Sequence, residues 1–327
     1  MRIVYLDHNI LNRMVRGSED SIRSLYEADG LCPVYSNANL DEIADSSVRR
    51  DEFLDLLIRL EAWYLSTPMD GSFNTLDQFV VTKINPREKI NELAEARAGH
   101  EENVEHLDFL SIMYGGGEGR MPSDVLLEGL EYAANTLRDL LNDPEFNGPN
   151  FVEQRNQAIA TLENLPTLQE EIRSGFRELD ERARSGPLTQ QMAEELGIGP
   201  TQLNNVKPPN VIQKVWEMVR PSYAPTISTM DEFLTTALSF NANSPNTQPE
   251  IVTRVNGLYN LLNILGFWRD EDLNRPRRMK ASFDDMTHVG YAISCNALYC
   301  GDKRMNIKAQ AIYEHCGITT QILDPQS

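Results

Sequence analysis

The chain has 327 residues, of which 41% are hydrophobic and 24% charged, a composition typical of a soluble globular protein with one to three domains. It carries 49 Asp and Glu against 30 Lys and Arg. The net charge of −19 argues against broad electrostatic binding of nucleic acid, so such binding would need local basic residues. We expect no membrane span and no signal segment. The four cysteines lack CxxC spacing and indicate reduced thiols in a cytoplasmic protein, without a zinc site.

The first predicted element is a buried strand at residues 3–6, a run of β-branched and aromatic side chains that ends at Asp7. A helix is expected over residues 10–26, with an acidic interruption at 17–20. A carboxylate at the tip of a central parallel strand lies where open α/β sheets hold their chemistry. The alternative is that Asp7 only caps the following helix.

A second strand is predicted at residues 31–35, followed by a helix over residues 36–43. Either Ser36 or Asn39 would cap this helix, and Glu42 is expected in its first turn. Two strand-to-helix turns near the start of the chain therefore each carry a carboxylate.

The middle of the chain, from residue 51 to about residue 268, is predicted to be helices and connections without a repeat. A capping box at Thr167–Glu170 would open one of these helices. The predicted helices cover residues 51–65, 122–142, 167–185, 210–219 and 250–267, and the predicted loops cover 143–149, 207–209 and 241–249.

The last fifty residues return to an α/β pattern, with helices at 283–294 and 307–315 and strands at 297–300 and 318–323. We therefore predict an α/β protein in which one parallel-sheet domain is assembled from both ends of the chain. Residues 1–50 and 275–327 would form that domain, and residues 51–274 would form a large, mainly α-helical insertion.

Four acidic residues are expected at the end of a strand, in the first turn of the helix after a strand, or near the start of a late helix. They are Asp7, Glu42, Asp285 and Asp302. The ends of parallel strands converge at one edge of a sheet, where several carboxylates would repel one another unless a cation neutralised them. Hard oxygen ligands favour Mg²⁺ or Mn²⁺, and such an ion can activate water for attack on a phosphate.

The ordered motifs resemble the PIN-domain family of metal-dependent ribonucleases. They are Asp7-His8-Asn9 after the first strand, Ser36 with Glu42 six residues later, Asp285 with His288 and Ala292 on a late helix, and Cys300-Gly301-Asp302-Lys303-Arg304 after the next strand. The resemblance covers about residues 1–45 and 280–327. Cys300 stands where the family has a hydroxyl residue, and the helical middle is longer than in compact family members.

The resemblance implies a PIN-like fold and roles for individual residues. Asp7 and Asp285 would bind the metal directly, whereas Glu42 and Asp302 would bind it directly or through water and orient the attacking water. Asn9 and Ser36 would be polar groups that support the ligands.

Three neighbouring residues leave alternatives open. Asp284 could exchange roles with Asp285, although the spacing to His288 favours Asp285. His288 follows one turn after Asp285 and is interpreted as a packed or ligand-supporting histidine rather than a nucleophile or zinc ligand. His8 is expected to cap the helix or to face solvent.

Basic residues flank the predicted acidic cluster and could hold RNA phosphates, or could belong to a solvated connector. They are Arg275, Arg277, Arg278 and Lys280 upstream of Asp285, and Lys303, Arg304 and Lys308 after Asp302.

Two further segments have competing interpretations. The glycine-rich segment 115–119 lacks the Lys-Ser/Thr of a phosphate loop and is interpreted as a flexible loop. Residues 188–206 resemble a helix-turn-helix, but the second helix has no Lys or Arg before Lys207, so a packed helical corner is the competing interpretation.

The sequence thus predicts a hydrolase: a Mg²⁺- or Mn²⁺-dependent endoribonuclease that leaves 5′-phosphate and 3′-hydroxyl ends, as the family resemblance implies. A toxin–antitoxin, phage-defence or RNA-processing setting fits equally. The insertion would select the RNA, form a homo-oligomer, or bind an inhibitor or activator protein. The alternatives are a nuclease acting on DNA, a catalytically silent PIN-like scaffold, or a DNA-binding regulator that uses residues 188–206.

Overall fold

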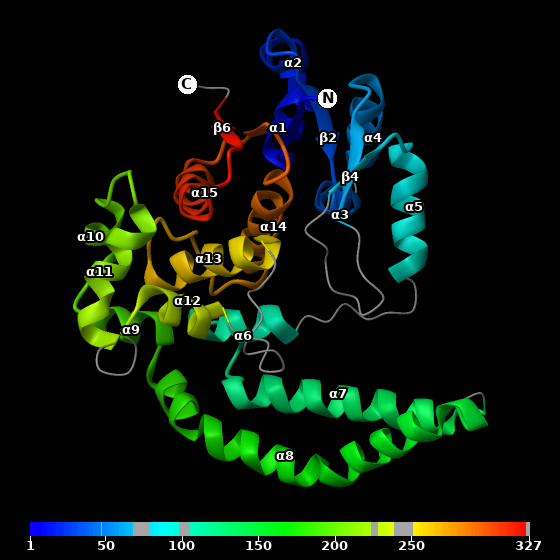
Figure 1. Ribbon diagram of the computed structural model, residues 1–327, viewed down its shortest axis with the longest axis vertical. Coiled ribbons are helices and arrows are strands. Elements are labelled where there is room, and N and C mark those ends of the chain that lie inside the picture. Colours follow the sequence, from blue (N-terminus) through cyan, green and yellow to red (C-terminus); the bar gives the residue numbers. More distant parts are fainter. Residues whose placement is uncertain are drawn as a thin grey trace. The chain divides into compact units, whose positions relative to one another are not determined.

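The structure is a computed structural model that describes residues 1–46, 48–67, 79–97, 105–144, 146–223, 228–238 and 251–324. It divides into two compact units (Figure 1). Unit 1 comprises Met1–Glu102, Ala193–Asp270 and Ala281–Ser327, and unit 2 comprises Asn103–Met192 and Glu271–Lys280. The boundaries expected at residues 50 and 274 differ from these, because unit 1 takes in much of the segment expected to be an insertion.

Unit 1 is built on a mixed six-stranded sheet in the order β4-β3-β2-β1-β5-β6. All neighbouring strands are parallel except β3 and β4, which pair antiparallel. The strands are β1 (Ile3–Leu6), β2 (Cys32–Tyr35), β3 (Trp63–Ser66), β4 (Val80–Thr82), β5 (Ala297–Tyr299) and β6 (Gln321–Leu323). The N-terminal strand β1 is central and pairs with β5 from the far end of the chain.

Alternate residues of β1 enter opposite cores, as the two-residue period of a strand requires. Ile3 and Tyr5 belong to one hydrophobic cluster, and Val4 and Leu6 belong to the other. The first cluster is completed by residues of the helices α11 (Val211–Tyr223), α13 (Ile251–Leu265), α14 (Pro276–Ala292) and α15 (Lys303–Cys316). The second is completed by residues of the helices α1 (His8–Arg13), α2 (Glu19–Ala28), α3 (Asn37–Asp45) and α4 (Arg50–Arg59). Helices therefore cover both faces of the sheet, which explains why every residue of β1 is apolar and buried.

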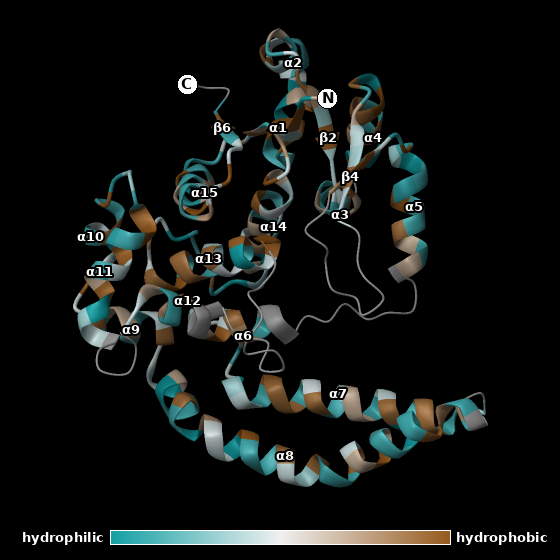
Figure 2. Ribbon diagram, in the orientation of Figure 1, coloured by the Kyte–Doolittle hydropathy of each residue, from teal (hydrophilic) through white to brown (hydrophobic). Residues whose placement is uncertain are grey.

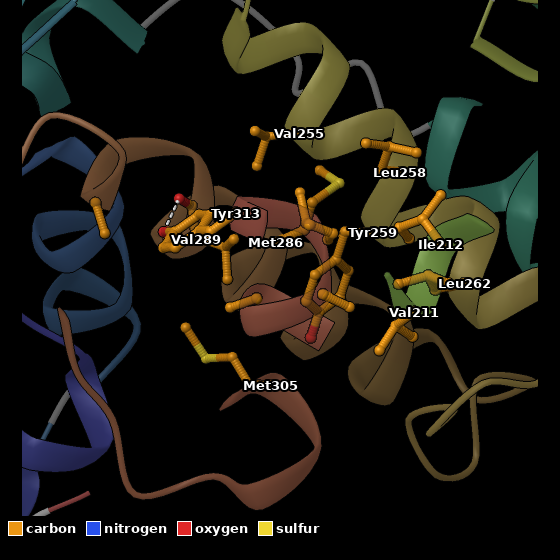
Figure 3. Packing of buried hydrophobic residues seen from close by; sticks show 14 of the residues in the cluster. Val211, Ile212, Val255, Leu258, Tyr259, Leu262, Met286, Val289, Met305 and Tyr313 are labelled. Carbon is orange, nitrogen blue, oxygen red and sulfur yellow. Dashed lines mark hydrogen bonds between the residues drawn. The ribbon is translucent and has the colours of Figure 1, made fainter. Parts of the chain in front are cut away.

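Figure 3 shows part of the first cluster. Tyr259 and Leu262 of α13 lie among side chains from α11, α14 and α15, and the hydroxyl of Tyr313 donates a hydrogen bond to the carbonyl oxygen of Val289 (2.7 Å). The helices of this cluster are α10 (Pro200–Asn204), α11 (Val211–Tyr223), α12 (Met230–Leu238), α13 (Ile251–Leu265), α14 (Pro276–Ala292) and α15 (Lys303–Cys316).

The N-terminal helices follow the predicted pattern closely. The interruption expected at residues 17–20 is a kink at Gly17, whose φ of 108° is readily adopted only by glycine. The helical elements are α1 (His8–Arg13), the π-helix η1 (Met14–Ser18), α2 (Glu19–Ala28), α3 (Asn37–Asp45), α4 (Arg50–Arg59) and α5 (Pro86–Arg97). Ser36 is the N-cap of α3, so Glu42 lies in the second turn of that helix. The prediction that Glu42 lies in the first turn is therefore wrong.

The prediction that residues 51–268 contain only helices and connections is wrong at two places. Residues 63–66 and 80–82 form β3 and β4 and extend the sheet. Trp63 and Tyr64 were assigned to a predicted helix because they continue an apolar run, but they pair with β2. A short apolar run does not by itself distinguish a strand from a buried helix.

Unit 2 contains α6 (Glu105–Met113), α7 (Pro122–Asn142), the short helix η2 (Pro149–Phe151) and α8 (Val152–Ser185). The helix α7 has the predicted bounds, and α8 ends where the sequence predicted. The prediction that a helix starts at Thr167 is wrong. The helix α8 starts at Val152, continues through Pro166 and packs along α7. Figure 2 shows that much of α8 is hydrophilic, consistent with a largely exposed surface.

The remaining helix, α9 (Leu188–Leu196), runs from unit 2 into unit 1. The loop expected at 241–249 lies outside the described residues. None of the helices in the described ranges combines the length and the apolar character needed to cross a membrane.

Candidate functional site

Asp7 lies at the carboxyl end of β1 and is almost fully buried, with 1% of its surface exposed. Its backbone N–H donates to the carbonyl oxygen of Tyr299 (3.1 Å), which ties it to the end of β5. Its side chain is the N-cap of α1 by position but makes no capping hydrogen bond. The Nδ2 group of Asn9 instead donates to Oδ2 of Asp7 (3.2 Å). The structure therefore does not support the capping alternative for this carboxylate.

A continuous chain of hydrogen bonds crosses the carboxyl ends of β1 and β2. The Ser36 hydroxyl lies 2.7 Å from the Tyr5 hydroxyl, which lies 2.7 Å from Nδ1 of His288. On the other side of the ring, Nε2 of His288 lies 2.6 Å from Oε2 of Glu42 and 3.9 Å from Oδ1 of Asp7. His288 is thus a buried residue that holds Glu42 in place, consistent with the supporting role expected for it.

His8 departs from its prediction. It is the first residue of α1, and its Nδ1 atom lies 3.7 Å from Oε2 of Glu42, with its ring 4.8 Å from that of Phe53. His8 therefore faces Glu42 rather than solvent. Burial lowers the pKa of His8, an effect only partly offset by the negative charge of Glu42. The first turn of α1, which reverses the strand direction, brings this side chain toward the acidic residues.

Asp285 and Asp302 complete the acidic set. Asp302 follows the turn after β5 and caps α15, where its Oδ1 atom accepts from the backbone N–H groups of Arg304 (2.7 Å) and Met305 (2.9 Å). Asp285, on α14, has no hydrogen-bond donor within reach among the described residues. The second oxygen of Asp302 makes no hydrogen bond to the described residues.

The electrostatics of these acids indicate mutual repulsion. Burial, and then the charges of Asp7, Asp270 and Asp302, hold the pKa of Asp285 well above its usual range. Burial also raises the pKa of Asp7, with the charge of His288 acting in the opposite direction. The negative charges of Asp7 and Asp302 therefore both disfavour ionisation of Asp285.

Lys308, expected among the basic residues that could hold RNA phosphates, is instead a buried structural residue. Lys308 is 0% exposed, and its Nζ atom lies 2.6 Å from Oδ1 of Asp270, 2.8 Å from Oδ1 of Asn263 and 3.9 Å from the ring centre of Tyr259. Its charge lowers the pKa of Asp285. The signal in the sequence was its position on the apolar face of α15, between Met305 and Ile312.

Cys300 directly follows the last residue of β5. Its thiol is buried, accepts from the backbone N–H of Asp302 (3.3 Å) and contacts the sulfur of Met305. Burial, followed by the charge of Asp7, raises the pKa of this thiol far above its usual range. Cys300 is therefore a neutral packing residue that shapes the turn.

The predicted RNA-binding residues fall in both units. Lys303 and Arg304 begin α15 in unit 1, and the ammonium of Lys303 lies 5.2 Å from the ring centre of Trp268. Arg277, Arg278 and Lys280 lie in the first turns of α14 within unit 2, where both arginines are exposed.

The glycine-rich loop 115–119 and the segment 188–206 are both packed against other described residues. The loop 115–119 is packed rather than flexible, since a Cβ at Gly116 would stand 2.5 Å from the carbonyl oxygen of Asn274. In the segment 188–206, α10 has only five residues and buries Leu203, with Leu196 and Val206 packed against the same cluster. These contacts favour the packed corner over a DNA-reading helix.

The carboxylate oxygens of the acidic residues are the type of ligand that a hard divalent cation prefers. Asp7, Asp285 and the second oxygen of Asp302 are carboxylate oxygens with unfavourable mutual charge, and a cation would relieve that repulsion. The described part of the chain does not present three acidic, histidine or cysteine side chains as a ready-made metal site. Glu42 is already bonded to His288 and would support the site through that contact.

Comparison of the chain with protein-family models, with curated proteins and with solved structures finds no match.

Proposed function

We propose that this protein is a hydrolase that cleaves RNA phosphodiester bonds endonucleolytically with the help of Mg²⁺ or Mn²⁺. The observation that carries the proposal is the buried Asp7 at the carboxyl end of β1, beside which His288 lies 3.9 Å from Asp7 and 2.6 Å from Glu42. The charges of Asp7 and Asp302 also raise the pKa of Asp285. Buried groups with strongly perturbed pKa values and a specific set of charged neighbours are candidates for catalysis. The resemblance of the motifs to the PIN-domain family supplies the reaction class.

In this proposal Asp7, Asp285 and Asp302 hold the divalent cation, which would polarise a water molecule and neutralise charge on the phosphate. The His288–Glu42 hydrogen bond orients the Glu42 carboxylate, which would accept a proton from the attacking water. The Tyr5 hydroxyl fixes the imidazole from the other side. Lys303 and Arg304, at the start of the helix that follows Asp302, would contact the RNA backbone.

One observation favours a second candidate. Glu42 is engaged by His288, and one oxygen of Asp302 is engaged by backbone N–H groups, so part of the acidic set already has partners. A catalytically silent scaffold with the same architecture would retain these contacts. A DNA-binding regulator is less favoured, because residues 196–206 pack their apolar side chains into unit 1.

The deciding experiment is incubation of a mixed RNA pool with the protein in Mn²⁺, in Mg²⁺ and in EDTA. The native chain is compared with Asp7→Asn and Asp285→Asn, and with Asp20→Asn as a control of equal charge change on an exposed surface of α2. Circular dichroism spectra establish that each variant is folded. Metal-dependent cleavage that is nearly abolished by the two site variants and retained by Asp20→Asn is the expected result.

Cleavage that survives both site variants would show that these carboxylates are not the active site. A folded native chain that binds RNA but does not cut it in either metal would favour the silent scaffold. The same incubations are run with DNA, and cleavage of DNA but not of RNA would keep the site and change the substrate.

A further inference from the structure

The last residue of α1, Arg13, lies at the same edge of the sheet as the acidic cluster but has no assigned role. It follows Asp7 by six residues. Its Nη1 atom lies 3.6 Å from the position that a Cβ on Gly301 would occupy, and the Cδ1 atom of Ile10, one helical turn before it, lies 3.8 Å from the same position. The Arg13 guanidinium therefore packs against the turn that carries Asp302.

This guanidinium has no partner in the described part of the chain. Its Nη1 atom is shielded from solvent and makes no hydrogen bond there. No described carboxylate lies within ion-pairing distance of Arg13. The Arg13 side chain is only partly buried. Of its three guanidinium nitrogens only Nη1 is both shielded and without a partner, so the edge formed by Nε and Nη2 faces outward.

Several other arginines hold carboxylates: Arg59 contacts Glu19, Arg87 contacts Asp51 and Asp55, Arg120 contacts Asp108 and Glu128, and Arg138 contacts Glu131. A shielded N–H donor without an acceptor costs free energy. An arginine that the fold leaves in this state beside acidic residues is suited to an anionic ligand.

Phosphodiester groups are the ligand that fits this arrangement. A guanidinium presents a planar fork of donors that matches two phosphate oxygens. Gly301 has no side chain, which leaves the turn beside the guanidinium open. A phosphate held at Arg13 would lie next to the turn that carries Asp302.

We infer that Arg13 is a substrate-binding residue that holds an RNA phosphate beside the acidic cluster. The inference rests on the proposed nuclease function and adds a residue that binds the RNA substrate. Arg13 offsets the repulsion between the acidic cluster and the polyanionic RNA, which the net charge of −19 would otherwise impose.

The test measures the affinity of the full chain for a fluorescein-labelled single-stranded RNA by anisotropy, in EDTA to prevent cleavage, at several salt concentrations. The variants are Arg13→Gln and Arg13→Lys. The matched control is Arg16→Gln, which removes the same charge three residues later at an exposed position. Thermal unfolding of each variant is recorded in parallel.

The expected result is that Arg13→Gln weakens RNA binding about tenfold, the scale of one lost charge-assisted contact. The slope of log affinity against log salt should fall by about 0.7, since one fewer phosphate is neutralised. Arg13→Lys should bind with intermediate affinity, and Arg16→Gln should bind as the native chain does. The melting temperature of Arg13→Gln should be unchanged or higher, because the substitution removes a donor that has no partner.

Arg13→Gln binding RNA with native affinity and native salt dependence would overturn the inference. Weaker binding accompanied by a matching loss of stability would also overturn it, because that pattern indicates a structural role. The nuclease proposal is judged separately by cleavage: a chain that binds RNA through Arg13 but never cuts it retains this inference and loses the proposed function. A native chain that binds no RNA at low salt would overturn the inference.

Discussion

The Nε2 atom of His288 lies 2.6 Å from Oε2 of Glu42, although 246 residues separate the two in the chain. The contact joins α14 to α3 at the carboxyl edge of the sheet. Through its other nitrogen, His288 reaches Tyr5 on the central strand. One imidazole therefore links the two ends of the chain at the candidate site.

This relationship predicts a pH-dependent stability. Burial by itself lowers the pKa of His288, but the hydrogen bond to Glu42 and the charges of Glu42 and Asp7 outweigh burial and raise that pKa above 6.5. The folded state thus holds the His288 proton more tightly than the unfolded chain does. The stability from this residue is fully present below about pH 6.5 and is lost as the pH rises through the raised pKa. Urea unfolding in EDTA between pH 5.5 and 8.5 should show this decrease.

His288→Gln should flatten that decrease. His315 provides a control of opposite sign, because burial, then the charge of Arg254, lowers its pKa. Its contribution to stability increases as the pH rises, so His315→Gln should make the overall decrease steeper. An unchanged pH profile in His288→Gln would assign the dependence to other groups.

Asp285→Asn should stabilise the metal-free protein at neutral pH. Burial and the neighbouring charges of Asp7, Asp270 and Asp302 oppose ionisation of Asp285, so replacing its carboxylate with a neutral amide of the same shape removes repulsion. We expect an increase of about 1 kcal/mol in the free energy of unfolding, the scale of one pKa unit. Chemical denaturation in EDTA measures it, and Asp20→Asn should have no comparable effect. A less stable Asp285→Asn variant would indicate that this carboxylate has a structural partner.

Mn²⁺ should raise the melting temperature of the native chain, and more so at pH 8 than at pH 6. Protons compete with the cation for the same carboxylates, whose pKa values are raised in the folded state. Asp285→Asn should lose most of this increase at both pH values. An equal increase in the variant would place the bound cation elsewhere on the acidic surface.

Lys308→Met should be strongly destabilising, by about 3–5 kcal/mol, because it leaves the carboxylate of Asp270 buried without its cation. The double variant Lys308→Met with Asp270→Asn should recover part of that loss, since both charges are then removed. Urea unfolding of the two single variants and the double variant gives the coupling free energy directly. Additive effects of the two substitutions would mean a coupling free energy of zero, so that the contact between Lys308 and Asp270 does not stabilise the fold.

Two glycines of unit 2 should respond in opposite ways to alanine. A Cβ at Gly116 would clash with the side chain of Ser111 and with the carbonyl oxygen of Asn274, so Gly116→Ala should destabilise the protein. Gly175 lies inside α8 with nothing within 4 Å of its Cβ position, so Gly175→Ala should add about 0.5–1 kcal/mol of stability. Thermal unfolding separates the two outcomes. Equal stability of Gly116→Ala and the native chain would restore the interpretation of this loop as flexible.

Local pattern was sufficient for elements whose side chains alternate or repeat regularly. The strand β1 and the helix α7 are found where they were predicted. The strand-turn-helix around Asp302 is also present, but α15 begins at Lys303 and not at residue 307. The local pattern was insufficient for β3 and β4, whose conformation depends on pairing across the sheet. It was also insufficient for α8, which packs along α7 and remains helical at Pro166.

The sequence by itself determined that Asp7 and Asp302 follow strands and precede helices, because strand and helix signals are local. It misplaced the other two acids: Asp285 lies inside α14 and not near its start, and Glu42 lies in the second turn of α3. Only the tertiary structure decided which of these residues meet. The turn into α1 directs His8 toward Glu42, α14 brings His288 to both Tyr5 and Glu42, and Lys308 lies buried against Asp270. These contacts join residues distant in the chain, and their formation depends on how the helices pack on the sheet.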